Sequence, residues 1–251
     1  MTNLKKILVF TATYNEIRNI NELILEINRH NSNVDILIID DNSPDGTSKE
    51  ILRLRNKMKN LILITREKKL GLDSAHKLGY KFALENKYDY LISMDADLSH
   101  DPKEIKNFIN HLINYPFVIG SRYISGGRCL MKGRRLLISK YGNLLIKKIL
   151  QIDLSEFTTS YRGFNLNMLK NFDLELVKTR GYSFFMGTIF EIHQRNFSIK
   201  EIPIVFKDRT KGSSKIPRLE IIRTLKNLII LSIRKIFGAP IKNWTWNASL
   251  P

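Results

Sequence analysis

The chain of 251 residues is long enough for one large α/β domain, and its hydrophobic content of 43% is sufficient for a sizeable core. Its formal net charge of +17 favours an anionic partner, such as a phosphorylated substrate, an anionic membrane surface or nucleic acid. A single cysteine, Cys129, excludes an intramolecular disulfide framework and a zinc site built from several cysteines.

We expect neither a secretion signal nor a membrane-spanning helix. The apolar run 7–10 breaks at Tyr14-Asn15-Glu16 and is too short for the core of a signal peptide. The most apolar later segment, 219–237, carries five charged side chains: Glu220, Arg223, Lys226, Arg234 and Lys235. Charges in mid-span cost ~2.5–3.5 kcal/mol each on insertion scales, so this segment should not cross a bilayer.

Apolar runs alternate with segments of helical periodicity through the first half of the chain. Strands are predicted at 6–11, 34–39, 61–65 and 90–94, and helices at 19–30, about 47–57 and 71–86. Strands that alternate with helices need crossover connections and therefore favour a parallel sheet. The predicted fold is α/β, with a Rossmann-like, mainly parallel sheet between layers of helices.

The second half is more basic. A strand and its exit are predicted at 117–123, helices at 136–150, 183–195 and 217–237, a strand at 199–207 and a basic loop at 207–215. From Val118 to Gln151 there is no acidic residue, and cations alternate with aliphatic side chains. This mixture favours an anionic lipid surface over nucleic acid, which would be expected to add aromatic stacking residues or a recognisable motif.

Polar or acidic residues follow three of the predicted strands. They are Thr13 to Glu16, Asp40 with Asp41, and Asp95 with Asp97. Each alone is more often ordinary loop chemistry, but parallel strands place their carboxyl ends at one edge, where these groups would converge. Asp95 and Asp97 suit Mg²⁺ or Mn²⁺ held against phosphate oxygens, and Asp40 or Asp41 suits a base or ribose. The absence of a phosphate-binding P-loop and of Gly-x-Gly-x-x-Gly argues against a P-loop NTPase and a dinucleotide enzyme.

Four cations of the second half are candidates for binding a second phosphate. They are Arg122, Arg135, Arg209 and Lys215. Guanidinium forks match phosphate geometry, although a solvated basic face is the alternative for any single one. The five histidines show no pair with metal-ligand spacing.

Several short motifs are spread between Lys6 and Arg234. The most specific are 41–47 (Asp-Asn-Ser-Pro-Asp-Gly-Thr) and 95–102 (Asp-Ala-Asp-Leu-Ser-His-Asp-Pro), joined by 13–16, 120–123, 181–184 and 212–215. With these motifs the chain resembles the inverting family 2 glycosyltransferases of GT-A fold, specifically the dolichol-phosphate and polyprenol-phosphate mannose synthases. The resemblance implies transfer of a sugar, typically from GDP-mannose, to a polyprenol phosphate.

The resemblance also implies roles for individual residues. Those on the donor side would be Thr13, Tyr14, Glu16, Asp40, Asp41, Lys69 and Asp95. The Mg²⁺ or Mn²⁺ cofactor would be held by Asp95, Asp97 and Ser99. The acceptor phosphate would be bound by Arg122, Arg135, Ser139, Arg209 and Lys215. The residues expected to carry the chemistry are Asp97, Arg122, Arg135 and Arg209.

The sequence departs from the family pattern at five positions. They are Ala12 for Pro, Asp73 for the second Gly of Gly-Leu-Gly, Ser160 within Thr158-Thr159-Ser160-Tyr161-Arg162, Phe185 for Gln and Gly187 for Glu. The last two lie in the pocket that the resemblance places near the transferred sugar or the acceptor.

We expect a catalytic domain at 1–215 and a basic amphipathic helix with its tail at 216–251, at the membrane interface. The resemblance implies a cytoplasmic protein that is bound peripherally to the cytoplasmic face of a membrane. A membrane-anchoring partner protein is compatible with this expectation, and binding to nucleic acid is not expected. The alternatives are a family 2 transferase that uses UDP-glucose, another UDP-sugar or a saccharide acceptor. Outside the enzymes, the alternative is a basic membrane- or nucleic-acid-binding domain.

Overall fold

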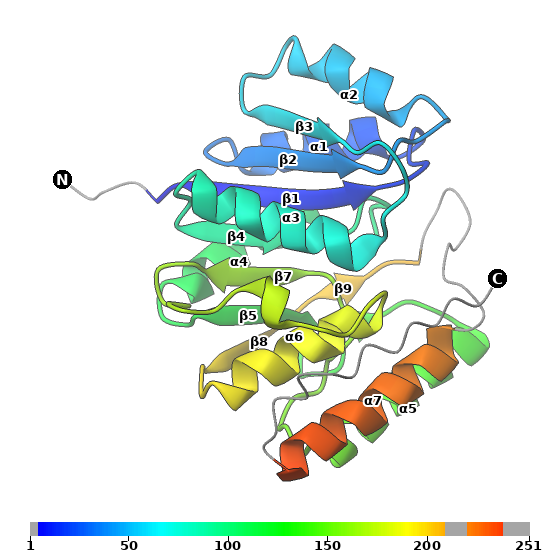
Figure 1. The fold of residues 1–251 in the computed structure, drawn as a ribbon. Coiled ribbons are helices and arrows are strands. Elements are labelled where there is room, and N and C mark those ends of the chain that lie inside the picture. The colour runs from blue at the N-terminus through cyan, green and yellow to red at the C-terminus, as the bar shows by residue number, and fades with distance from the viewer. Residues whose placement is uncertain (1–4, 209–219, 238–251) are drawn as a thin grey trace.

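The computed structural model describes residues 5–208 and 220–237. Seven strands form one sheet in the order β3-β2-β1-β4-β7-β5-β8 (Figure 1). They are β1 (Ile7–Thr13), β2 (Asp35–Asp40), β3 (Leu61–Thr65), β4 (Tyr90–Ser93), β5 (Phe117–Ser121), β7 (Arg162–Asn165) and β8 (Ile199–Pro203). Only β7 runs against its neighbours, so the carboxyl ends of the other six strands lie at one edge.

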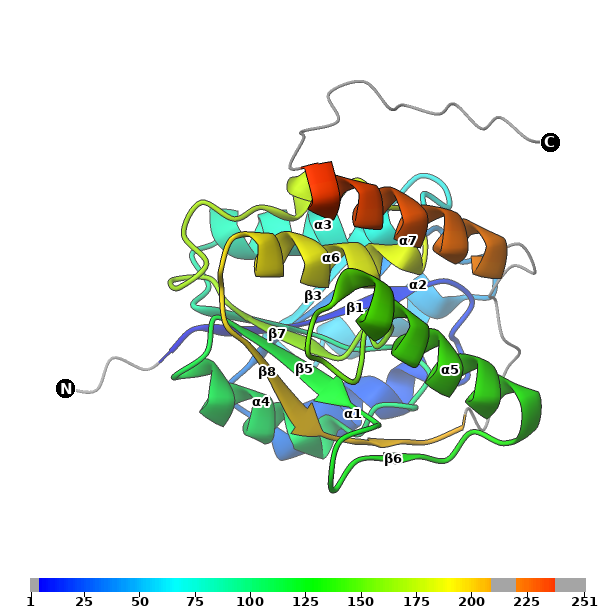
Figure 2. The same ribbon diagram turned by 90° about the horizontal axis from the view of Figure 1, so that it is seen from below.

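Helices cover both faces of this sheet, as Figure 2 shows from below. The helices are α1 (Ile20–His30), α2 (Thr47–Arg55), α3 (Leu72–Glu85), α4 (Ile105–Leu112), α5 (Gly133–Leu150), α6 (Ser183–Gln194) and α7 (Glu220–Phe237). Two short 3₁₀ helices are η1 (Pro102–Glu104) and η2 (Leu174–Leu176). Alternation along β1 supplies both cores: Leu8 and Phe10 join the cluster under α3 and α6, and Ile7 and Val9 join the cluster under α1, α2 and α4.

The predicted α/β fold with a mainly parallel sheet is confirmed, and one predicted strand is corrected. Residues 199–207 form two strands instead of one. The Ile204 N–H donates to Ser121 O at 3.0 Å beside β8, and the Ile204 carbonyl accepts from Arg128 N at 2.9 Å. Hydrogen bonding therefore passes at Ile204 from the large sheet to a small one, which pairs β6 (Arg128–Cys129) with β9 (Val205–Phe206). The boundary predicted at 215/216 lies outside the described residues.

The last described helix, α7, packs beside α5 and α6 (Figures 1 and 2). Leu228 and Leu231 enter the core, whereas the outer faces of α5 and α7 leave large apolar side chains exposed. These include Leu137, Ile138, Tyr141, Leu144 and Ile149 on α5, and Ile222, Ile229, Ile233, Ile236 and Phe237 on α7. We name these exposed residues the α5–α7 face. Within the described ranges, no helix has the length and apolar character to span a bilayer.

Candidate active site

The carboxyl ends of β1 and β2 are joined by the side chain of Asp40. Its fully buried carboxylate accepts hydrogen bonds from Thr13 Oγ1 at 2.8 Å, from Ser43 N at 2.9 Å and from Ser48 Oγ at 2.6 Å. Ser43 Oγ donates to the same carboxylate. Two residues predicted for the donor side therefore form one rigid polar unit that holds the loop after β2 against the end of β1.

Asp41 organises the loop that leads into α3. Its carboxylate forms a buried ion pair with Arg66 and accepts two backbone N–H groups just before α3, at 3.2 and 3.3 Å. The same loop brings Lys69 over the ring of Tyr14, with Nζ 4.2 Å from the ring centroid. The structure thus gathers Tyr14, Asp41 and Lys69, which are distant in sequence, at the same edge of the sheet.

Glu16 lies in the loop after β1, where it meets the start of α2. Its carboxylate accepts a hydrogen bond from Asn19 Nδ2 at 2.7 Å, and its N–H donates to Thr47 Oγ1 at 3.0 Å. The side chain is buried. Glu16 therefore ties the loop after β1 to the loop after β2. Six residues predicted for the donor side thus lie together: Thr13, Tyr14, Glu16, Asp40, Asp41 and Lys69.

The loop after β4 holds the two carboxylates predicted to bind a metal. Asp95 Oδ1 accepts from Ser160 Oγ at 2.6 Å. Asp97 Oδ1 accepts from the Ser99 N–H at 3.1 Å and from Ser99 Oγ at 2.5 Å. Ser99, predicted as a further ligand, thus fixes the orientation of Asp97 in this structure.

A neutral imidazole supports this loop from behind. Burial lowers the pKa of His100 and outweighs the opposite influence of Asp95 and Asp97. Its Nδ1 accepts the Asp95 N–H at 3.1 Å, so the ring proton is assigned to Nε2, which lies 3.4 Å from Thr159 Oγ1. His100 therefore fixes the backbone of Asp95 without carrying a charge.

The chemistry of Asp95 and Asp97 fits a hard divalent cation. Both supply carboxylate oxygens, from an Asp95 side chain that is 38% exposed and a buried Asp97. Mg²⁺ and Mn²⁺ prefer oxygen ligands and commonly keep several places for water and substrate phosphate. Within the described residues no set of three or more His, Cys, Asp or Glu side chains could hold a metal, so the other ligands would be a hydroxyl such as that of Ser99, substrate oxygens or water.

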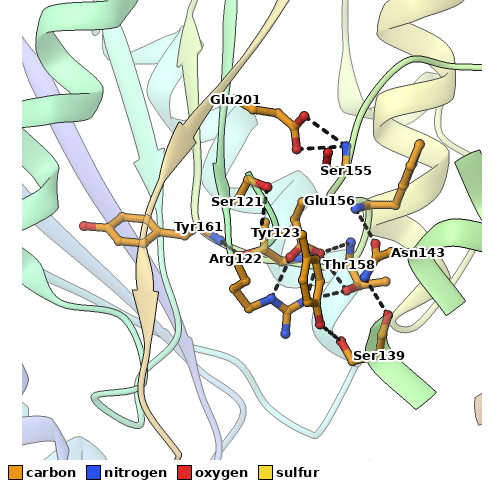
Figure 3. Close-up of polar contacts among 12 residues, drawn as sticks. Ser121, Arg122, Tyr123, Ser139, Asn143, Ser155, Glu156, Thr158, Tyr161 and Glu201 are labelled. Atoms are coloured by element: carbon orange, nitrogen blue, oxygen red, sulfur yellow. Dashed lines mark hydrogen bonds and ion pairs between the residues drawn. The ribbon is translucent and has the colours of Figure 1, made fainter. Parts of the chain in front are cut away.

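On the other side of β4, Arg122 is held in a buried ion pair with Glu156. Its Nε and Nη2 donate to the two Glu156 oxygens at 2.6 and 2.8 Å, and Nη2 also donates to Thr158 Oγ1 at 2.8 Å (Figure 3). Burial would raise the pKa of Glu156, but the guanidinium outweighs it and the pKa is lowered. Burial opposes the charge of Arg122 as well, yet Glu156 leaves the pKa of Arg122 raised. Both groups are therefore ionised.

Tyr123 connects Arg122 to α5. The Arg122 guanidinium lies 5.2 Å from the Tyr123 ring centroid, and the Tyr123 hydroxyl donates to Ser139 Oγ at 2.7 Å (Figure 3). Arg135 lies one helical turn before Ser139 and forms an exposed ion pair with Asp208 at 3.1 Å. Three residues predicted for the acceptor are thus close together, while Arg209 and Lys215 lie outside the described residues.

The acidic loop after β4 and the region around Arg122 are connected by the segment 156–160 and by the ring of Phe206. The segment 156–160 contacts Arg122 through Thr158 and Asp95 through Ser160. The ring of Phe206 lies 5.4 Å from the His100 ring and 5.1 Å from the Arg122 guanidinium. The predicted metal site and the predicted acceptor site are therefore neighbouring parts of one site.

Four of the five departures from the family pattern have visible contacts. Asp73 Oδ1 accepts the Gly181 N–H at 3.0 Å and so joins the start of α3 to the start of α6. Ser160 binds Asp95, Phe185 is buried beside His76, and Gly187 lies against Thr179. Ala12 is a half-buried residue of β1 that packs on the core.

Sequence reasoning did not single out Glu156, gave Tyr123 no role beyond the motif 120–123, and listed Ser160 only as a departure from the family pattern. Glu156 is a single acidic residue outside any predicted strand end, and nothing in its spacing points to Arg122. The only sequence signal was the long acid-free stretch before it, because a buried arginine there needs a carboxylate from elsewhere.

Solved structures that share this fold include sugar transferases. A glucosyl-3-phosphoglycerate synthase from Mycobacterium tuberculosis, in complex with Mn²⁺ and UDP, aligns with a TM-score of 0.65 and 15% identity over 95% of this chain and 82% of that one. A mannosyltransferase from Pyrobaculum calidifontis, in complex with GDP-Man and Mn²⁺, aligns with a TM-score of 0.55 and 15% identity over 96% of this chain and 77% of that one. The chain therefore has the GT-A fold.

Sequence comparison places the chain more narrowly. Residues 8–172 match Glycosyl transferase family 2. An undecaprenyl-phosphate mannosyltransferase from Micrococcus luteus is 31% identical over 84% of this chain and 87% of its own length. A polyprenol monophosphomannose synthase from Mycolicibacterium smegmatis is 32% identical over 84% of this chain and 81% of its own. The chain belongs to Glycosyl transferase family 2, which confirms the resemblance and the prediction of a glycosyltransferase.

Proposed function

We propose that the protein transfers mannose from GDP-mannose to a polyprenol monophosphate and inverts the anomeric configuration. The similarity of more than four fifths of the chain to two polyprenol-phosphate mannosyltransferases carries this proposal. GDP-mannose as donor is supported by the mannosyltransferase of the same fold that binds it. The charge pattern agrees, because donor and acceptor are both phosphates and the cations around Arg122 lie next to the acidic loop.

The chemistry asks little of the protein beyond alignment and charge compensation. A phosphate monoester has a second pKa of about 6, so the acceptor is already a nucleophile near neutral pH and needs no general base. One of its oxygens attacks the anomeric carbon, the bond from that carbon to the diphosphate breaks, and one displacement inverts the centre. We assign Arg122, Arg135, Ser139, Arg209 and Lys215 to the acceptor phosphate.

We assign the divalent cation to Asp95 and Asp97, with Ser99 as a further ligand. When bound, Mg²⁺ or Mn²⁺ would stabilise negative charge on the departing diphosphate. Protein residues orient these ligands: Ser160 binds Asp95, Ser99 binds Asp97, and His100 fixes the backbone of Asp95. The residues of the first two loops, with Lys69, would bind the nucleotide.

We also assign the α5–α7 face to the surface of an anionic bilayer. Tyr141 is 64% exposed, Ile222 is 64% exposed and Ile236 is 73% exposed, which is unusual for apolar side chains that cluster. Basic residues accompany them, including Lys140 and Lys148 on α5. Ser139, on α5 as well, is tied to Tyr123, so a lipid phosphate at the bilayer surface would reach the acceptor residues directly. This supports a peripheral, cytoplasmic enzyme.

The experiment that tests the function is a panel of sugar nucleotides offered to the purified protein with and without polyprenol phosphate. We expect GDP-mannose to be consumed with polyprenol phosphate and Mg²⁺ or Mn²⁺, to give a β-linked lipid from the α-linked donor. Use of a UDP-sugar, transfer to a saccharide or a retained configuration would each contradict the proposal.

The variant Asp97→Asn tests the metal assignment. Loss of one of two carboxylates should lower transfer by about 100-fold or more, beyond the ~10–100-fold typical of losing a supporting partner of a ligand. The same exchange at Asp101, which caps η1 and pairs with Lys207, is the control and should retain activity. A folded Asp97→Asn protein with normal, metal-dependent turnover would reject the assignment.

A further inference from the structure

Glu156 is a fully buried carboxylate whose oxygens are used entirely inside the protein. In addition to Arg122, Oε1 accepts Thr158 N at 2.9 Å, Thr158 Oγ1 at 2.9 Å and Thr159 N at 3.2 Å. These donors add three hydrogen bonds to the two that the guanidinium makes. An acceptor phosphate that met Arg122 would therefore face a carboxylate that is already compensated.

The backbone on either side of Glu156 is held from three directions. The Ser155 N–H donates to both oxygens of Glu201, at 3.0 and 2.9 Å, and the Phe157 N–H donates to Asn143 Oδ1 at 2.7 Å (Figure 3). Arg162, itself buried, donates from Nη2 to Phe157 O at 3.0 Å. Glu156 is thus a fixed point, and Arg122 is the side chain whose position depends on it.

This arrangement leaves Arg122 with a defined direction. Nε and Nη2 make the bonds to Glu156 and Thr158, and Nη1 takes part in none of them. The rings of Tyr123 and Phe206 lie 5.2 and 5.1 Å from the guanidinium and restrict its rotation. An arginine that is fixed before its ligand arrives loses less conformational entropy on binding than a mobile one.

We propose that Glu156 is a positioning residue for the acceptor: it holds the guanidinium of Arg122 in the orientation that binds the lipid phosphate. The inference rests on the proposed function, because it takes Arg122 as an acceptor ligand. Two effects compete. The negative charge of Glu156 repels a phosphate, and its hydrogen bonds orient the arginine. Orientation dominates here, since the charge is buried and also accepts hydrogen bonds from two backbone N–H groups.

The test compares Glu156→Gln with wild type in steady-state assays that vary the polyprenol phosphate and the GDP-mannose separately. We expect the KM for polyprenol phosphate to rise by about tenfold, because a misplaced binding group loses alignment with its ligand. The KM for GDP-mannose should stay within about twofold, and slow hydrolysis of GDP-mannose by water should persist, since neither needs the acceptor phosphate. Glu156→Asp keeps the charge and should recover part of the loss.

The matched control is Glu191→Gln. Glu191 is also a buried carboxylate paired with arginine, at 2.7 Å from Arg195 and 2.6 Å from Arg234, but it lies on α6 away from Arg122. Thermal unfolding of both variants separates folding defects from binding defects. We expect Glu191→Gln to lower the melting temperature and to leave the KM for the acceptor unchanged.

A second variant covers the case in which Glu156→Gln does not fold. Thr158→Val removes the hydroxyl that bonds both Arg122 and Glu156 without leaving a buried charge unpaired, and should raise the KM for the acceptor by about threefold. An unchanged or lower KM for the acceptor in a folded variant would overturn the inference, as would equal changes for donor and acceptor. If wild type transfers no sugar to polyprenol phosphate, the proposed function itself fails, and that result is seen before any variant is compared.

Discussion

His76, in the middle of α3, is buried among aromatic side chains. Its ring lies 5.0 Å from Phe10, 5.7 Å from Phe184 and 5.1 Å from Phe185, measured between centroids. Burial lowers the pKa of His76 to about 3, and the nearby Arg162 charge acts in the same direction. The folded protein therefore holds this imidazole in its neutral form throughout the physiological range.

The free energy of unfolding should therefore depend on pH, and His76→Leu should weaken this dependence. Between pH 6.5 and about 3 the unfolded chain binds a proton at His76 and the folded chain does not, so stability falls as pH falls through this window. At pH 5 the loss is about 2 kcal/mol, from about 1.5 pKa units at about 1.36 kcal/mol each. Denaturant unfolding at pH 7 and pH 5 should show a smaller difference for His76→Leu than for wild type. The same exchange at the exposed His193 is the control and should leave the difference between pH 7 and pH 5 as in wild type. A difference that is also unchanged in His76→Leu would contradict the role of His76.

For single residues, the sequence predicted where acidic side chains gather, but not which protein groups they bind. Asp40 and Asp41 were both predicted for the donor side, and the structure adds that Asp40 ties β1 to the next loop and that Asp41 pairs with Arg66. Adjacent residues of one type face different neighbours once the strand ends, and only the fold determines which neighbours those are. Glu156 could not be predicted for the same reason: its partner lies 34 residues away.

Two helices carry glycines in opposite surroundings. On α6, a Cβ at Gly187 would lie well inside van der Waals contact with Thr179 Oγ1 and 3.0 Å from Val177 Cγ1. On α5, a Cβ at Gly142 would meet nothing within 4 Å. The first glycine is required by close packing, and the second only loosens its helix.

Alanine at each position should therefore change stability in opposite directions. Gly142→Ala should raise the free energy of unfolding by roughly 0.5–1 kcal/mol through its helix preference. Gly187→Ala should lower it by about 1–3 kcal/mol, because the segment 177–179 must move. Chemical denaturation of the two variants measures both, and equal shifts of the same sign would contradict this account of α6.

Helices and strands could be predicted from the sequence where the apolar pattern is strong. They could not be predicted where pairing with other strands determines the structure. The apolar runs predicted β1 to β4, and periodicity predicted α1 and α3, since each of these helices buries one side. The helix α6 was also predicted, although it is buried on all sides over residues 183–192. The strand β7 has the sequence Arg-Gly-Phe-Asn and no alternation, and it exists because β4 and β5 pair with it from both sides. Its antiparallel direction depends on these neighbours and is not encoded in its own four residues.

The whole molecule combines a strongly positive charge with one large exposed apolar surface. The net charge is +17, and the α5–α7 face concentrates exposed aliphatic side chains between basic ones. On an anionic bilayer, the positive charge would attract the protein and burial of the apolar side chains would retain it. Both contributions should be measurable separately.

Co-sedimentation with vesicles should show binding that increases with anionic lipid and decreases with salt. Leu144→Glu on α5 and Ile229→Glu on α7 test the face, because these side chains are 59% and 58% exposed. Each variant should lower the partition coefficient into vesicles by about tenfold, since burial of such a side chain contributes ~1.5–3 kcal/mol. The same change at Leu25 on α1, which is 48% exposed, is the control. Equal losses for all three variants would refute a specific α5–α7 face.

The start of α6 depends on a segment that the ribosome makes late. Glu220 Oε1 accepts the Tyr182 N–H at 2.8 Å, across 38 residues of sequence. At roughly 5–20 residues per second, about 2–8 s pass between synthesis of the donor and synthesis of its acceptor. Asp73, which accepts the adjacent Gly181 N–H, is made long before, so the two acceptors of this junction are synthesised at different times. A chain whose synthesis stops between residues 182 and 220 would therefore lack one of the two carboxylates that hold the start of α6.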